Sequence, residues 1–226
     1  MKPYLNNKIL WNGGGAIVSV KMFGRKIGMT QIFNKEGFAL PVTAISVGPC
    51  FITQIKTKKK NGYNAIQVGY FKCNSKNLSK AQLGLFKKYN LPPLLYLQEY
   101  KVASTNDYVI GQLITVDEFH IGQFVNITGK SIGKGFSGNQ TRHKFKRGPM
   151  THGSKNHRAP GSIGPGTTPG RVFPGKLMAG QLGSRQVSIS NLEILGRDIN
   201  KNVLILKGSI PGKSGNLLSL VKSEKS

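Results

Sequence analysis

A run of 48 residues in the middle of the chain, 129–176, constrains the fold more than any other part of the sequence. It contains eight apolar side chains, 11 glycines, five prolines and ten Lys or Arg, without one Asp or Glu. Carboxylates are absent over the wider range 119–192. So little apolar surface cannot offset the cost of ordering the backbone. We therefore expect 129–176 to be an extended loop that becomes ordered on a partner, and a loop of this length is usually functional.

The sequence on either side of this loop predicts strands. Asn61-Gly62 predicts a hairpin between two of them, and a short helix is expected over 79–89, before Leu91-Pro92-Pro93. Runs rich in β-branched and aromatic residues, with partial alternation, predict strands at 38–47, 51–57, 65–71, 113–116, 124–128, 186–195 and 203–207. A mainly β fold with little helix follows, as an antiparallel barrel or sandwich.

The predicted organisation has three parts. Both ends of the chain contribute strands, so we expect one barrel body from 22–128 and 177–222, interrupted by the loop at 129–176. Residues 1–21 contain no Arg and one Ser, a composition that fits a transit peptide poorly. We interpret them as a retained N-terminal extension, with Met22 as an ancestral start. The apolar run at 16–20 is far shorter than the roughly 20 residues of a membrane helix, so no membrane span is expected.

Composition indicates a polyanionic partner. The 226 residues include 33 Lys or Arg but only 8 Asp or Glu, which gives a net charge of +25. This charge favours nucleic acid and is unusual for an enzyme acting on neutral metabolites. Cys50 and Cys73 form no C-x-x-C pair, which disfavours a disulfide-rich secreted domain and a thiolate zinc site. We expect a reduced compartment.

Three glycine-rich motifs resemble nucleotide sites only superficially. The G-x-G-x-x-G at 133–138 is followed by no amphipathic helix and by no acidic residue about 20 positions later, as a dinucleotide site requires. The P-loop spacing at 170–177 ends in Leu177, where a magnesium-binding hydroxyl is needed. Gly212-Lys213-Ser214 supplies the hydroxyl, but Gly208 lies one residue too close. We therefore expect no nucleotide and no other cofactor.

The histidines of the loop allow three interpretations. His143, His152 and His157 could bind a metal, but no Asp, Glu or Cys lies within 119–192 to complete the ligand set. They could instead make structural hydrogen bonds, or stack on bases and donate to phosphates. The last interpretation is favoured, because arginines lie beside them. A separate lysine-rich run at 56–60 is equally compatible with a solvated loop tip and with phosphate contact.

Several segments resemble the large-subunit ribosomal protein L3 family. They read GRKIGMTQIF at 24–33, GKGFSG at 133–138, RGPMTHGS at 147–154, HRAPGSIG at 157–164, TPGRVFPGK at 168–176, MAG at 178–180 and KGSIPG at 207–212. The resemblance spans roughly 22–220 in order, and GTTPG at 166–170 is most similar to cyanobacterial and plastid members. Lys far exceeds Arg and Asn is abundant, as in AT-rich genomes such as those of plastids. Some bacterial members carry a methylated Gln where this chain has Thr167, so that modification cannot occur at this position.

The resemblance implies a split β-barrel of the translation-protein type, seated on large-subunit rRNA. It also implies a loop that extends toward the peptidyl-transferase centre, a role in early subunit assembly, and no catalysis. The implied partners are rRNA and neighbouring large-subunit proteins, without a membrane, metal or small-molecule substrate. The implied location is the plastid ribosome in the stroma, with the bacterial cytoplasm as the alternative.

From the residues and the resemblance together, basic, aromatic and imidazole side chains are expected to bind rRNA. They are Arg25, Lys26, Lys130, Lys134, Phe136, Arg142, His143, Lys144, Lys146, Arg147, His152, Lys155, His157, Arg158, Arg171, Lys176 and Arg185. Two other functions stay open. A nucleotide-dependent enzyme is disfavoured by the incomplete phosphate loops. A free nucleic-acid chaperone or DNA-compacting protein is compatible with the charge, because phosphate neutralisation is blind to sequence.

Overall fold

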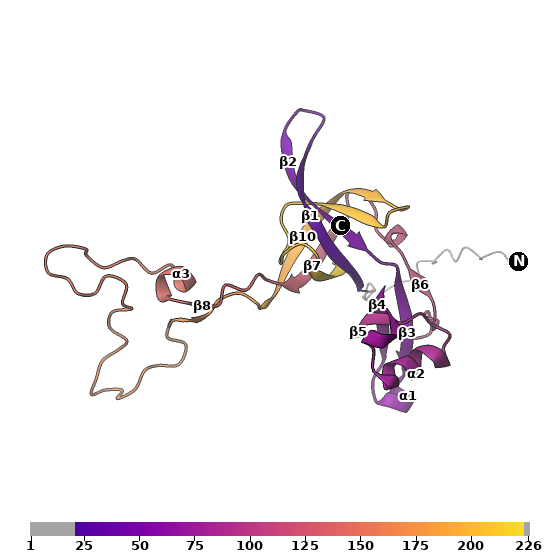
Figure 1. Ribbon diagram of the computed structural model, residues 1–226, viewed down its shortest axis with the longest axis horizontal. Coiled ribbons are helices and arrows are strands. Elements are labelled where there is room, and N and C mark those ends of the chain that lie inside the picture. Colours follow the sequence, from indigo (N-terminus) through magenta and orange to yellow (C-terminus); the bar gives the residue numbers. More distant parts are fainter. Residues whose placement is uncertain (1–20, 224–226) are drawn as a thin grey trace, which may run out of the picture. The chain divides into compact units, whose positions relative to one another are not determined.

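The fold is mainly β, as the sequence predicts. The computed structural model describes residues 21–223 and contains two compact units, one formed by Lys21 and Cys50–Ile114 and the other by Met22–Pro49 and residues 115–223. Strands dominate both units, and the longest described helix has nine residues (Figure 1). Within residues 21–223, no helix combines the length and apolar character that a membrane crossing requires.

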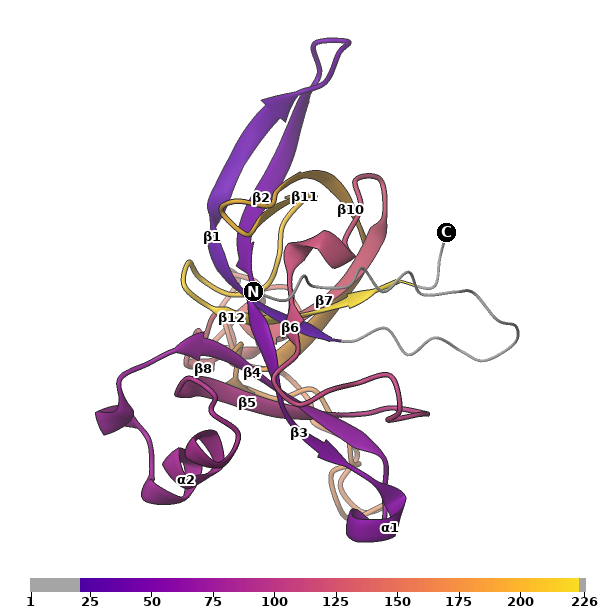
Figure 2. The ribbon, with the colours of Figure 1, turned by 90° about the vertical axis from the view of Figure 1, so that its right-hand side faces the viewer.

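The second unit is built on a closed antiparallel barrel. Its six strands, in spatial order, are β1 (Met22–Phe33), β12 (Leu217–Lys222), β7 (Phe124–Lys130), β10 (Gln186–Asp198), β11 (Val203–Lys207) and β2 (Ala39–Val47). Three of these strands (β1, β2 and β7) precede the long loop in the sequence, and three (β10, β11 and β12) follow it (Figure 2). Strands from both sides of the long loop therefore share one barrel.

Alternating apolar residues fill the barrel. Leu218 and Leu220 of β12 are fully buried, and the pattern repeats at Leu204 and Leu206 of β11. Gly24 lets β1 lie close to β2, because a Cβ there would stand 2.9 Å from the backbone oxygen of Ser46. Burial of this kind supplies most of the free energy that keeps a small barrel folded.

The other unit contains a four-stranded antiparallel sheet. Its spatial order is β5 (Leu94–Lys101), β4 (Ala65–Lys72), β3 (Cys50–Lys56) and β6 (Leu113–Ile114). The strands predicted at 51–57, 65–71 and 113–116 are thus present but lie outside the barrel, so the single body expected from 22–128 is wrong. The reason is physical: two-residue periodicity indicates a strand with one buried face but does not specify its neighbours.

Local signals in this unit are accurate. Helix α2 (Lys80–Lys88) begins after Ser79, whose hydroxyl accepts from the Gln82 N–H while Gln82 caps the Ser79 N–H. The predicted hairpin joins β3 and β4, but the connection is the helical turn α1 (Lys58–Asn61), not a two-residue turn. Gly62 ends that turn with φ +83°, a conformation suited to glycine. One 3₁₀ turn lies in this unit at Ser75–Asn77, and another lies in the barrel unit at Val116–Glu118.

Candidate RNA interface

The long loop leaves the barrel as a two-stranded ribbon. Strands β7 and β10 pair as far as Lys130 and Gln186, and pairing resumes between β8 (Phe136–Ser137) and β9 (Gly180–Gln181). Between these ladders the Ser131 N–H donates to the Arg185 oxygen at 2.8 Å. The Lys134 N–H likewise donates to the Leu182 oxygen at 2.9 Å. Figure 1 shows this ribbon leading from β7 and β10 to β8 and the short helix α3 (Asn139–His143).

One glycine makes the close approach of the two ribbon strands possible. Gly183 has φ +75°, and a Cβ there would lie 2.0 Å from the backbone oxygen of Ile132. No L side chain fits that contact, and most disfavour that backbone conformation. Gly183 therefore fixes the path of the ribbon between its two ladders.

A clamp at α3 closes the end of the ribbon. The Arg142 guanidinium donates from Nη1 to the Met178 carbonyl oxygen at 2.7 Å, and His143 Nε2 lies 3.0 Å from the same oxygen. Asn139 Nδ2 donates to the Leu177 oxygen at 3.4 Å. Gly180 leaves room for the guanidinium, since a Cβ there would lie 2.5 Å from Arg142 Nη1. Arg142 and His143 are consequently half-buried, and they hold the two sides of the loop together.

A second closure lies within the loop. The Gly148 N–H donates to the His157 oxygen at 3.0 Å, and His157 Nδ1 lies 2.9 Å from the Pro149 oxygen. Gln140 Nε2 reaches the same His157 oxygen at 3.4 Å and so connects this closure to α3. A Cβ at Gly148 would lie 2.1 Å from the Asn156 oxygen, so glycine is required for the approach. His157 and His143 therefore hold the loop through main-chain carbonyls.

The remaining cations of the loop face solvent. Lys144, Lys146, Arg147, Lys155 and Arg158 are all exposed. So are Lys130, Lys134, Arg171, Lys176 and Arg185, together with His152. The salt bridges described within residues 21–223 join Lys56–Glu99, Lys207–Glu193 and Lys222–Glu118, and none reaches the loop. With no carboxylate in 119–192, these charges repel one another unless an external anion lies among them.

Apolar side chains of the loop are exposed as well. Phe136 is 81% exposed, and Ile132, Met150, Ile163 and Phe173 are also open to solvent. Phe145 is the exception: it is half-buried, with its ring centroid 6.1 Å from that of His143. An exposed set of cations and aromatic rings is the combination that binds single-stranded nucleic acid through phosphates and base faces.

Comparison with known proteins places the chain in a family. The sequence model of ribosomal protein L3 matches residues 98–201. The large ribosomal subunit protein uL3c of Gracilaria tenuistipitata var. liui is 56% identical over 203 residues, which cover 90% of this chain and 99% of the relative. The chain belongs to the ribosomal protein L3 family.

Other relatives of the L3 family agree. The uL3c protein of Phaeodactylum tricornutum is 57% identical over 204 residues, covering 90% of this chain and 99% of the relative. The large ribosomal subunit protein uL3 of Picosynechococcus sp. is 53% identical over 207 residues, covering 91% and 97%. The predicted family is confirmed, and its cyanobacterial and uL3c relatives match the predicted type. L3 proteins are structural and non-enzymatic, so the nucleotide-dependent enzyme is set aside.

Two predicted contacts on the barrel of this L3-family chain have intramolecular partners. Lys26 is half-buried, and its Nζ donates to the oxygens of Ile210 and Gly212 at 3.1 Å each. Arg25 Nε donates to the Gly215 oxygen at 3.2 Å. An ammonium has three protons, so Lys26 keeps one donor for another acceptor. Both side chains therefore fasten the 208–216 turn to β1.

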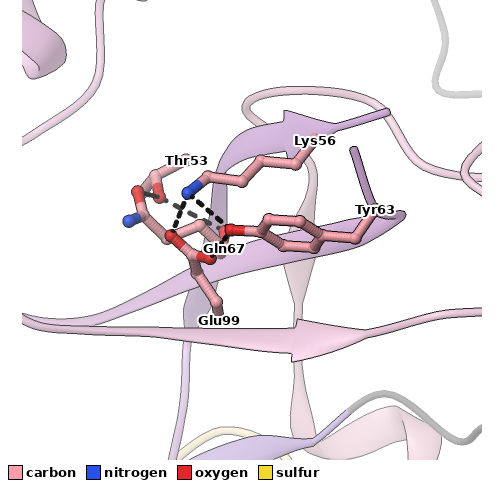
Figure 3. A network of polar contacts seen from close by, with 5 residues as sticks. All are labelled: Thr53, Lys56, Tyr63, Gln67 and Glu99. Atoms are coloured by element: carbon pink, nitrogen blue, oxygen red, sulfur yellow. Dashed lines mark hydrogen bonds and ion pairs between the residues drawn. The ribbon is translucent and has the colours of Figure 1, made fainter. Parts of the chain in front are cut away.

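Lys56 is neutralised within the four-stranded sheet (Figure 3). Its Nζ lies 2.5 Å from Glu99 Oε1 and donates to the Tyr63 hydroxyl at 3.1 Å, while that hydroxyl donates to Glu99 Oε2 at 2.9 Å. Hydrogen bonds from Lys56 and Tyr63 lower the pKa of Glu99, and bonding to Glu99 raises the pKa of Lys56. Of the basic run at 56–60, only the exposed Lys58, Lys59 and Lys60 keep free charge.

Some contacts in the interface carry no signal in the sequence. The acceptors of the clamp and of the second closure are the main-chain carbonyls of Leu177, Met178 and Pro149, which any residue could supply. The burial of Asn139 also carries no signal in the sequence. Its side chain is buried, and its Oδ1 has no hydrogen-bond partner within the described chain. No group of three or more His, Cys, Asp or Glu that could hold a metal ion occurs among residues 21–223.

Proposed function

We propose that this L3-family protein is a structural constituent of the large ribosomal subunit, which binds the rRNA directly through the segment between β7 and β10. The observation that carries the proposal is the set of ten exposed Lys and Arg residues over 130–185, in a stretch without a carboxylate. Neutralising phosphates releases counterions, which supplies affinity for any nucleic acid. The curated relatives are large ribosomal subunit proteins, which supports rRNA as the nucleic acid.

The predicted contacts divide into two kinds. Lys130, Lys134, Lys144, Lys146, Arg147, Lys155, Arg158, Arg171, Lys176 and Arg185 point to solvent and would bind phosphates, while Phe136 and His152 are open for stacking. Arg142, His143 and His157 shape the loop first, and Arg25 and Lys26 hold a turn of the barrel. These five side chains would contact RNA through N–H groups that their intramolecular hydrogen bonds do not use.

The loop would reach toward the peptidyl-transferase centre and support early assembly of the subunit. The paired ribbon and the two closures fix the direction in which the loop leaves the barrel. The exposed apolar side chains of the loop would be buried against the rRNA. Phosphates would cancel the charge and allow the segment to order among rRNA strands. It would contribute shape and positive charge, and no group to the chemistry of peptide-bond formation. The uL3c and cyanobacterial relatives favour a plastid ribosome.

Co-sedimentation tests the proposal. A subunit protein should remain at one copy per large subunit through a sucrose gradient in high salt, because shape and stacking contacts survive the screening that removes phosphate attraction. A lysine-rich chain of similar charge, such as a histone tail peptide, serves as the control and should be stripped. Loss of this protein under the same conditions would favour a free nucleic-acid chaperone.

A further inference from the structure

The hairpin of β1 and β2 differs in chemistry from the rest of the molecule. Ile27 and Met29 are half exposed, and Phe33 and Phe38 are each 66% exposed. Between residues 27 and 41 the only charged side chains are Lys35 and Glu36, which cancel. In a chain with a net charge of +25, this segment is neutral and apolar.

This part of the hairpin extends past the barrel strands. β12 pairs with β1 only at Met22 to Arg25, and β11 pairs with β2 only at Val42 to Ser46. Among the described strands, residues 28–33 of β1 therefore pair only with β2, and residues 39–41 of β2 pair only with β1, as Figure 2 shows for the projecting ends of the two strands. An exposed apolar hairpin that is left uncovered favours aggregation.

One face of the hairpin gathers uncharged side chains. Directly paired residues of an antiparallel ladder point to the same side, and the register pairs Gln31 with Pro41 and Phe33 with Ala39. Met29 lies on this side too, two residues before Gln31. Met29, Gln31, Phe33, Ala39 and Pro41 form what we call the hairpin face, and an open depression is lined by four of them with Thr30.

The tip of the hairpin is held in one conformation. Asn34 Oδ1 accepts from the N–H groups of Glu36 and Phe38, at 3.1 and 2.7 Å. The Asn34 N–H donates to the Phe38 oxygen at 3.0 Å, and the Gly37 N–H donates to the Asn34 oxygen at 3.1 Å. A surface ordered in advance loses little entropy when a partner binds, which suits it to docking.

We propose that the hairpin face is a docking surface for a neighbouring protein of the large subunit that presents an uncharged, apolar patch. RNA is disfavoured because the segment offers no net charge to phosphates, unlike the loop of the same unit. A second copy of this chain is disfavoured because it would bring another +25 against the first. An apolar protein surface matches both the neutrality and the exposed Met29 and Phe33.

Photo-crosslinking within intact large subunits tests this surface. The docking proposal rests on the proposed function, because its partner is a protein of the large subunit. A benzophenone amino acid at Phe33 should crosslink to a protein at apolar residues, and the same group at Phe136 should crosslink to rRNA. Adding Met29→Lys should lower the yield from position 33 about tenfold, since it places a charge in the interface, whereas Met29→Leu should keep it.

The two positions separate the possible failures. Crosslinks from position 33 to rRNA, to a second copy, to residues of the same chain, or to nothing would each overturn the docking proposal. Failure of position 136 to reach rRNA would count against the RNA-binding loop and leave the result at position 33 to stand by itself. Absence of the protein from large subunits would overturn both proposals.

Discussion

Arg142 donates a 2.7 Å hydrogen bond from its guanidinium to the main-chain oxygen of Met178, a residue 36 positions later. This contact closes the loop across its base, and His143 shares the acceptor. A cation that the sequence suggests as a phosphate ligand thus acts first on the protein. The exposed Lys144, Lys146 and Arg147 follow directly on the clamp, so the fixed end of the loop presents them together.

This arrangement predicts different effects for neighbouring cations. Lys144→Gln, Lys146→Gln and Arg147→Gln combined should lower the salt dependence of rRNA binding, by a slope of about 0.7–0.9 for each phosphate that is no longer neutralised. The barrel should unfold at an unchanged temperature, because these side chains are exposed and lie outside the barrel strands. Affinity measured against log salt, for parent and variant, checks the slope; an unchanged slope would show that the three groups face solvent in the complex.

Arg142→Gln should act through the shape of the loop. The variant loses the donor to Met178, so proteases should cut between 138 and 179 faster in the free protein, whereas the triple variant should be cut at the parental rate. Arg142→Lys is the matched control, since it keeps the charge but replaces the planar fork. Equal cleavage of the parent and Arg142→Gln would mean that the clamp does not hold in solution.

Gly183 provides a test of the ribbon. Gly183→Ala places a methyl group 2.0 Å from the Ile132 oxygen at φ +75°, so the ribbon must shift. We expect a local cost of about 1–3 kcal/mol, seen as faster amide hydrogen exchange at Ser131, Lys134 and Leu182. Gly166→Ala is the control, because a Cβ there meets nothing within 4 Å and the backbone is not left-handed. Parental exchange in Gly183→Ala would contradict the ribbon geometry.

The fold was predictable where local chemistry decides it. Helix α2 follows from the Ser79 capping signal and the prolines after Leu91, and β7, β10 and β11 follow from their apolar alternation. Strand β5 is missed because Leu94 to Lys101 alternates poorly, and the short β12 near the C-terminus lies outside the predicted runs. The separate four-stranded sheet could not be predicted, since strand partners depend on distant residues.

The interface shows the same division. Exposure of the loop cations follows from composition, because a segment with eight apolar groups in 48 residues has no core to enter. The roles of Arg142 and His157 do not follow, since their acceptors are main-chain oxygens without a side-chain signature. The neutralisation of Lys56 by Glu99 likewise needs β3 and β5 to lie on either side of β4.

The pair of Lys56 and Glu99 predicts a pH dependence for the four-stranded sheet. The pKa of Glu99 is lowered from its usual 4.5, so its contribution is present above that pH and is lost as pH falls through the folded-state pKa. The pKa of Lys56 is raised from 10.5, so its contribution is present below that pH and is lost as pH rises through the folded-state pKa. Both therefore stabilise the sheet at neutral pH.

Glu99→Gln should lower the urea midpoint of this unit at pH 7, and the difference from the parent should shrink as the pH falls through the folded-state pKa of Glu99, which lies below 4.5. Lys56→Met tests the other partner, and the double variant should cost less than the sum of the two single changes. Glu36→Gln is the control: Glu36 lies in the exposed turn of the hairpin and should leave the midpoint unchanged over the same pH range. A Glu99→Gln effect that keeps its full size down to the acid unfolding of the parent would show that the pair does not titrate as described.

Removing the loop separates docking from positioning. Residues 138–179 carry eight of the loop cations, and Ser137 and Gly180 are directly paired. Strands at that spacing can be joined by a short Gly-Ser turn, so β8 and β9 should stay paired and the barrel should keep its unfolding temperature. Lys130, Lys134 and Arg185 remain on the ribbon, and with the barrel they should still bring the protein into large subunits.

The expected deficit lies in what the loop orders. Without the eight cations and the exposed Met150 and Phe173, the rRNA around the loop loses its counter-charge and its stacking partners. Subunits carrying the deletion should therefore mature slowly or react weakly with puromycin, while quantitative mass spectrometry shows parental occupancy. A deleted protein absent from subunits would identify the loop as the main anchor. Parental occupancy together with parental puromycin reactivity would mean that the exposed charge of 138–179 is dispensable, and the proposed role of the loop would fall.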